Sequence, residues 1–77
     1  MWHKIEKNDS VIRNASKGDH LRFIGDSGDL IGDIEETYLI LEIYNEIIEY
    51  VSVKNEKVKI KEINRFETGN WYFKKTL

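Results

Sequence analysis

The sequence contains no cysteine and no proline among its 77 residues. Without cysteine the chain can form neither a disulfide framework nor a thiolate zinc site, so folding must rely on an apolar core or a partner. No apolar run approaches the roughly 20 residues that span a bilayer. The first residues also lack the apolar stretch of a signal peptide. We therefore expect a cytoplasmic protein that does not insert into a membrane.

The chain is also too short for two domains or for a cofactor-binding α/β unit beside a substrate site. Its mass is 9.1 kDa, 40% of its residues are apolar and 34% are charged. These fractions are typical of a globular protein rather than a disordered one. We expect residues 1–77 to form one domain with a small core.

Positive charge is missing from the middle of the chain. No lysine or arginine lies between Arg22 and Lys54, whereas that stretch carries eight acidic residues. From Lys54 onward seven basic residues face three acidic ones. The net charge of -2 therefore hides an acidic middle and a basic end.

Apolar residues recur mostly at every second position, a spacing that favours β-strands. We expect strands over 19–25, 37–43, 47–54, 57–61 and 71–73, and an edge strand over 2–5. A polar, glycine-containing loop should follow the first full strand. Ile63 and Phe66 are three residues apart, which suits a single 3₁₀ or helical turn over 62–66. The predicted fold is an all-β small barrel of five to six antiparallel strands.

The turns suggest which residues share a face. A two-residue turn at 55–56 pairs Val53 with Val58 and Val51 with Ile60 on one face. A two-residue turn at 45–46 would put Leu39 on the face away from Val51, so we prefer a three-residue connection over 44–46, which places Leu39 opposite Val51 on that same face.

The same connection places Ile43 opposite Ile47 and needs Asn45 or Glu46 in the left-handed conformation. It also puts Glu49 beside Leu41, which a β-bulge near Glu49 would relieve.

The stretch from Lys17 to Glu67 resembles SH3-like small barrels with a KOW-type opening, of the kind found in small bacteriophage proteins. The residues that carry the resemblance are Gly18-Asp19, Leu21, Phe23, Gly28, Gly32, Ile34 and the turn Ile63-Asn64-Arg65-Phe66. The resemblance implies an SH3-like barrel over the whole chain. KOW domains contact RNA or protein, so it implies a binding role.

The acidic block is the first candidate site. Clustered carboxylates on a rigid barrel could imitate nucleic-acid phosphates and dock into a basic site on a host protein. The alternative is a solvated surface that keeps the protein soluble. The candidate residues are Asp26, Asp29, Asp33, Glu35, Glu36, Glu42 and Glu49.

The second candidate is apolar. In the predicted register Tyr38, Ile40, Ile48 and Tyr50 lie on the sheet face away from Leu39. If uncovered, they form a protein-binding patch with aromatic anchors. The alternative is that both sheet faces are buried.

The third candidate is the basic strand that contains Lys57, Lys59 and Lys61, which is flanked by Tyr50, Trp71 and Tyr72. Basic side chains among aromatic rings suit single-stranded nucleic acid. The negative net charge disfavours this use.

Catalysis is not expected. The stretch Gly25-Asp26-Ser27-Gly28 copies part of a serine-protease signature, but the chain is too small for the two barrels that hold such a triad. No nucleophile–base pair and no metal cluster stands out, so we expect no cofactor and no metal.

The sequence thus predicts a non-enzymatic protein-binding module, a phage-type inhibitor or adaptor of a host defence nuclease, effector or transcription component. A nucleic-acid-binding barrel and a homo-oligomeric assembly module are the alternatives.

Overall fold

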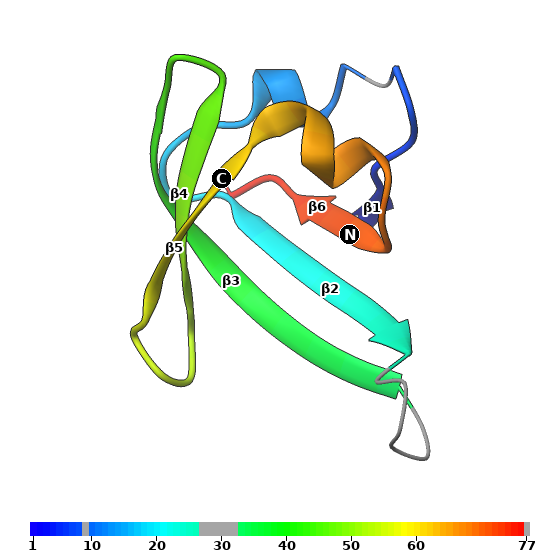
Figure 1. The fold of residues 1–77 in the computed structure, drawn as a ribbon, viewed down its shortest axis with the longest axis vertical. Helices are drawn as coiled ribbons and strands as arrows, with labels where there is room; N and C mark the ends of the chain where they lie inside the picture. The colour runs from blue at the N-terminus through cyan, green and yellow to red at the C-terminus, as the bar shows by residue number, and fades with distance from the viewer. Residues whose placement is uncertain (9, 27–32, 77) are drawn as a thin grey trace.

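The computed structural model describes residues 1–8, 10–26 and 33–76 and forms one open sheet of six antiparallel strands (Figure 1). The elements in chain order are β1 (His3–Lys4), η1 (Ile12–Asn14), β2 (His20–Asp26), β3 (Asp33–Tyr44), β4 (Ile47–Ser52), β5 (Val58–Glu62), η2 (Ile63–Glu67) and β6 (Trp71–Lys74). Both η elements are 3₁₀ turns. In space the strands follow the order β1-β6-β2-β3-β4-β5, so β1 and β5 are the two edges.

The predicted fold class is confirmed: the described residues form antiparallel strands and short 3₁₀ turns. The expected strands all form, with ends that differ by a few residues, and η2 lies where a turn was expected. β3 begins at Asp33 instead of residue 37, because it pairs with β2 along the full length of that strand. The short turn η1 has no counterpart in the prediction. In the part of the chain that is described, no helix has the length and apolarity needed to cross a membrane.

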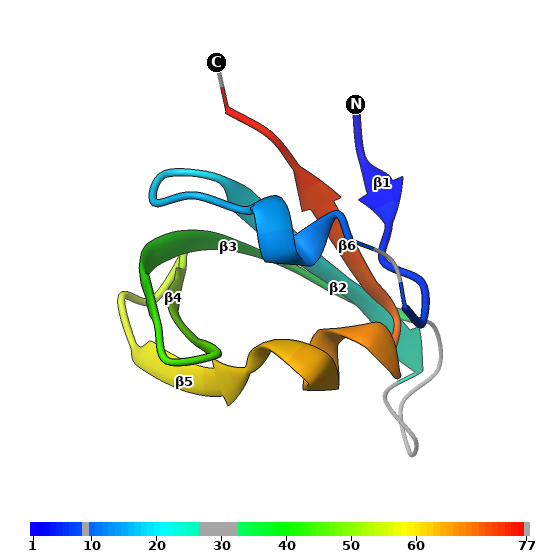
Figure 2. The same ribbon diagram turned by 90° about the horizontal axis from the view of Figure 1, so that it is seen from above.

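The sheet curls around an apolar core on its inner face, with η1 and η2 beside it (Figure 2). Tyr38, Ile40, Ile48 and Tyr50, the four residues predicted to lie on an uncovered face, are at most 7% exposed and belong to this core. The prediction of an apolar binding patch on these residues is therefore wrong. The other core residues are Ile5, Ile12, Leu21, Ile63, Phe66, Trp71 and Phe73.

The pairing of β2 with β3 explains this reversal. Leu21 lies opposite Tyr38, and residues opposite each other in an antiparallel pair share a face. Because Leu21 is fully buried, Tyr38 must also face the core. Leu39 consequently faces outward, against the prediction.

A β-bulge at Leu41 then changes the faces of β3. Leu39 lies opposite Val51, as predicted, but beyond the bulge Ile43 lies opposite Ile48 and packs on the core. The extra residue is thus on β3 and not near Glu49, where the bulge was expected. A bulge moves the residues after it to the opposite face, so the two ends of β3 present different sets of side chains to solvent.

The turn between β3 and β4 contains two residues, not the predicted three, because Tyr44 pairs with Ile47. Asn45 and Glu46 both have positive φ, at 48° and 63°. Two positive φ values are what a type I′ hairpin turn requires, and its twist matches that of the strands. The predicted left-handed residue is therefore present at both candidate positions.

Asp19 is a buried carboxylate that fastens the end of the chain to the turn before β2. It accepts hydrogen bonds from the Ser16 amide at 2.8 Å, the Thr76 amide at 3.0 Å and the Lys75 ammonium at 3.2 Å. Burial acts to raise the pKa of Asp19, but the bonds from Thr76, Ser16 and Lys75 outweigh it and hold the pKa below the usual 3.8. The carboxylate therefore stays ionised although only 2% of the residue is exposed.

We predict that Asp19→Asn lowers the free energy of unfolding by about 1–3 kcal/mol near neutral pH, because the buried donors lose their anionic acceptor. The folded-state pKa lies below the unfolded one. The stabilisation is therefore present above about pH 4 and is lost as the pH falls through the folded-state pKa. Urea unfolding near neutral pH and at about pH 2 will measure it.

The gap between wild type and Asp19→Asn should shrink at acid pH. Glu56→Gln, at an exposed position, serves as the control and should show no such gap. A gap of equal size at both pH values would contradict the role assigned to Asp19.

Candidate functional site

The outer side of β4 and β5 carries aliphatic side chains in contact with solvent. Val53, Val58 and Ile60 are 56%, 53% and 63% exposed, and Val51, opposite Val58, is half-buried. These four residues are named here the β4–β5 apolar face. Val51, Val58 and Ile60 share a face as predicted, and Val53 follows in the turn after β4, but that face points away from the core. Clustered exposed aliphatic side chains are typical of a binding surface.

The pairing of β5 with β4 also differs from the prediction by two residues. Val51 lies opposite Val58 instead of Ile60, so the connection spans residues 53–57. The Val53 amide donates to the Thr37 carbonyl at 3.1 Å, which extends the contact between β4 and β3 beyond Ser52. A shift of two residues leaves every side chain on its own face.

The lysines of β5 point inward. The Lys59 ammonium lies 5.6 Å from the centre of the Tyr38 ring, and the Lys61 ammonium lies 4.7 Å from that of Trp71 and 5.5 Å from that of Phe66. The faces of aromatic rings attract cations, and lysine stems cover apolar surface. β5 therefore has an inverted pattern: its lysines cover the aromatic core, and Val58 and Ile60 face solvent.

Three cationic side chains, those of Lys59, Lys61 and Arg65, lie near one another on the inner side of β5. Desolvation lowers the pKa of Lys61, and the positive charges of Arg65 and Lys59 lower it further. Among the described residues, no carboxylate oxygen lies within 4.0 Å of the charged nitrogen atoms of these four side chains: Lys57, Lys59, Lys61 and Arg65. This edge of the sheet therefore carries cations without a close ion-pair partner, and Glu62 is the acidic residue that lines the pocket beside Lys61 and Arg65.

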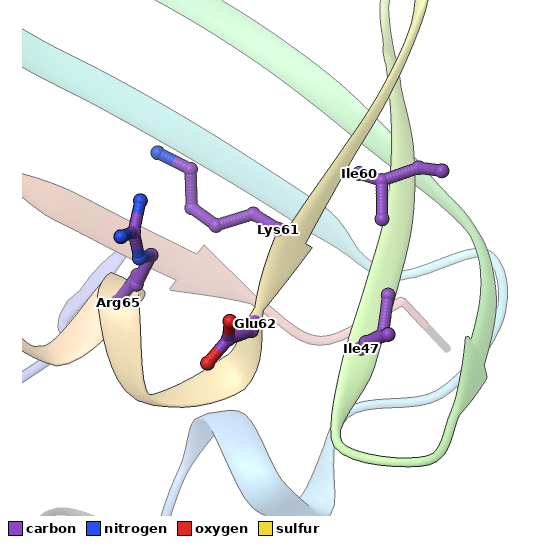
Figure 3. Close-up of a pocket in the computed structure, with 5 residues that line it drawn as sticks. All are labelled: Ile47, Ile60, Lys61, Glu62 and Arg65. Atoms are coloured by element: carbon purple, nitrogen blue, oxygen red, sulfur yellow. The ribbon is translucent and has the colours of Figure 1, made fainter.

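A half-open pocket of about 360 Å³ lies where β5 meets η2. It is lined by Ile47, Ile60, Lys61, Glu62 and Arg65 (Figure 3). The close-up shows Lys61 and Arg65 on one side of β5 and the two isoleucines on the other. The pocket therefore lies between the side of β5 that carries the lysines and the side that carries the aliphatic residues.

The acidic candidates at the start of β3 have internal partners. Glu35 lies 3.4 Å from Arg22, and Glu36 accepts a hydrogen bond from the buried hydroxyl of Ser52. Neighbouring residues of a strand point to opposite faces, so these two carboxylates do not form one surface. Asp26 ends β2 and Asp33 begins β3.

The acidic candidates at the far end of β3 lie opposite each other. Glu42 pairs with Glu49 across the strands. Lys17 lies 3.5 Å from Glu42, and the Tyr44 hydroxyl donates to Glu49 at 2.6 Å. Seven residues separate Glu35 from Glu42, about 23 Å along an extended strand. The predicted block is thus divided between two ends of β3, and Asp29 lies outside the described residues.

The described residues do not assemble a catalytic constellation. The Ser52 hydroxyl contacts Glu36, but Ser52 is only 3% exposed and no imidazole contacts it. In the described ranges, no group of three or more histidine, aspartate or glutamate side chains is placed to hold a metal ion.

Sequence reasoning missed two features of this surface. It placed Val58 and Ile60 on one face with Val51 and Val53 without predicting that this face is exposed, and it did not single out Arg65 as part of the basic group. The signal that could have shown the first is the alternation of valine and isoleucine with three lysines, which marks β5 as an edge strand with inward charges. Arg65 follows Lys61 by four residues, so η2 brings it back beside β5.

We predict that Lys61→Met promotes self-association. Edge strands avoid pairing with other copies partly through inward-pointing charges, and methionine keeps the apolar stem while removing the charge. Sedimentation velocity across a concentration series should show larger species for this variant than for the wild type. Lys74→Met on β6, which is flanked by strands on both sides, is the matched control. Equal sedimentation of the two variants would show that Lys61 does not protect the edge.

Relatives of this chain would be expected to share three features: the open sheet, the edge strand β5 with its lysines inward, and the acidic residues divided between the ends of β3. The resemblance to SH3-like barrels with a KOW-type opening stays a prediction. No protein-family model, no curated protein and no solved structure matches this chain.

Proposed function

We propose that this chain is a non-enzymatic protein-binding module whose partner docks on the β4–β5 apolar face. In the cytoplasm it acts as an inhibitor or adaptor, by occupying a site on a host protein. The observation that carries the proposal is that β5 presents Val58 and Ile60 to solvent, each more than half exposed. A small domain needs its aliphatic side chains for its core. Their placement outside the core therefore favours a role in binding.

The apolar face supports protein binding better than the acidic residues do. Glu35, Glu36, Glu42 and Glu49 have partners within the chain, and these four divide between the two ends of β3. A partner would have to displace those contacts before it could use the carboxylates. Val58 and Ile60 have no such internal competitor, and covering them removes apolar surface from water.

Nucleic-acid binding is less well supported. Bases would need exposed aromatic faces on which to stack. Tyr38, Tyr50 and Trp71 are at most 7% exposed, and the lysines of β5 already cover that side of the core. The lysines alone do not make a stacking platform.

Site-specific cross-linking tests the proposal. A photoreactive benzoylphenylalanine placed at position 60 in the full chain should cross-link one host protein in cells. The same group at position 6 is the control, because Glu6 is exposed beside β1, at the opposite edge of the sheet. An adduct that forms from position 60 and not from position 6 supports the proposal. No adduct at position 60, or the same adduct from both positions, contradicts it.

Substitution gives an independent measure. Val58→Thr with Ile60→Thr keeps β-branched side chains on β5 and removes apolar area, so the fold should persist while affinity for the cross-linked partner falls at least roughly tenfold. The triple variant Glu35→Gln, Glu36→Gln, Glu42→Gln is the matched control for the acidic residues. A loss of affinity in the triple variant alone would move the contact surface to the carboxylates.

A further inference from the structure

β5 has one side that no other strand covers. Its residues pair with β4 from Val51–Val58 to Ile47–Glu62, and β5 is the last strand of the sheet. In the described ranges, no backbone hydrogen bond outside the regular strands and helices joins residues 58–61 to another element. The other edge, β1, is two residues long, which is too short to pair with an extended segment over any length. The open side of β5 is therefore the place where a strand can be added.

The side chains along this open side define what kind of strand fits. An added strand keeps the alternation of faces, so every second residue lies beside Lys59 and Lys61 and the others lie beside Val58 and Ile60. The four cations on the lysine side lack a carboxylate partner among the described residues: Lys57, Lys59, Lys61 and Arg65. Glutamate or aspartate would neutralise them, and valine, isoleucine or leucine would extend the apolar face.

The pocket beside β5 agrees with this pattern. It is lined by Lys61 and Arg65 on one side and Ile60 on the other, and Glu62 lies in it as well, so its lining holds two cations and one carboxylate (Figure 3). A side chain from an added strand would enter it next to two cations. Desolvation, together with the nearby charges of Arg65 and Lys59, lowers the pKa of Lys61.

A second copy of this chain fits less well. Antiparallel pairing of β5 with itself about Ile60 would place Lys59 opposite Lys61 of the other copy and the reverse. Like charges directly opposite each other destabilise a strand pair. The same lysines that favour an acidic strand thus disfavour self-pairing.

We propose that β5 captures an extended segment of its partner, in which acidic residues alternate with aliphatic ones, by β-strand addition. The proposal rests on the proposed function and specifies the chemistry of the partner. Backbone hydrogen bonds to the open side of β5 supply affinity, and the alternating side chains supply selectivity. The aliphatic residues of the segment continue the β4–β5 apolar face, and its carboxylates lie beside Lys59, Lys61 and Arg65.

A synthetic peptide in which glutamate alternates with valine is the probe. Titrated into the full chain and followed by amide NMR shifts, it should perturb β5 and slow hydrogen exchange on the open side of that strand. A peptide with lysine in place of glutamate should bind at least roughly tenfold more weakly, and salt should weaken the acidic peptide's binding. Lys59→Gln with Lys61→Gln should cause a similar loss, whereas Lys74→Gln, on an internal strand, should not.

Backbone methylation tests the mode of binding. N-methyl groups on alternate residues of the peptide block one of its two edges. Methylation of the edge that faces β5 should abolish binding, and methylation of the other edge should not. Equal binding of the two methylated peptides would overturn strand addition.

Three further outcomes of the peptide experiments would also decide whether β5 binds by strand addition. No binding of the acidic peptide, no preference over the lysine peptide, or tighter binding of a single-stranded oligonucleotide would each overturn the proposal. These results would leave the cross-link from position 60 unaffected, so a failure of strand addition is distinguishable from a failure of the proposed function. If position 60 yields no cross-link either, both proposals fall together.

Discussion

The packing of one indole ring holds most of the structure together. Trp71 on β6 lies with its ring centre 4.8 Å from Phe66, 5.3 Å from Phe23, 5.6 Å from Tyr38 and 5.9 Å from Tyr50. These rings come from η2, β2, β3 and β4, and each such pair contributes about 0.5–1.5 kcal/mol beyond the burial of its area. For the tyrosines to reach the indole, β3 and β4 must turn their aromatic side inward. Their aliphatic side then faces solvent, so the exposed surface is a consequence of the aromatic core.

The strands could be predicted from the sequence, but their faces could not. Residues 38–41 are Tyr-Leu-Ile-Leu, and four consecutive apolar residues supply both faces of a strand with candidates for the core. Only the pairing of Leu21 with Tyr38, across a long connection, decides between them. The bulge at Leu41 carries no glycine that would mark it. Local patterns therefore identify β3 as a strand and leave its orientation to tertiary contacts.

The candidate site was harder to predict because it, too, depends on which face of a strand is buried. The rule that aliphatic residues face the core misassigns Val58 and Ile60, since the ammonium groups of Lys59 and Lys61 lie over the aromatic rings on that side of β5. Positions where a local rule fails are often functional, and here the failure leaves two aliphatic residues of an edge strand more than half exposed. The sequence shows the acidic block as a stretch of negative charge. The division of these residues between the two ends of β3 depends on the length of that strand and on its bulge.

The strand order also separates the chain's ends from β5. The N-terminal strand is one edge of the sheet and β6 is next to it, whereas β5 is the other edge. In Figure 2 both marked ends lie on the side of the molecule away from β5. A fluorophore, an affinity handle or a second protein joined at either end would therefore leave β5 accessible. The domain could thus be displayed on a scaffold, or repeated in tandem, with each copy's outer strand still exposed.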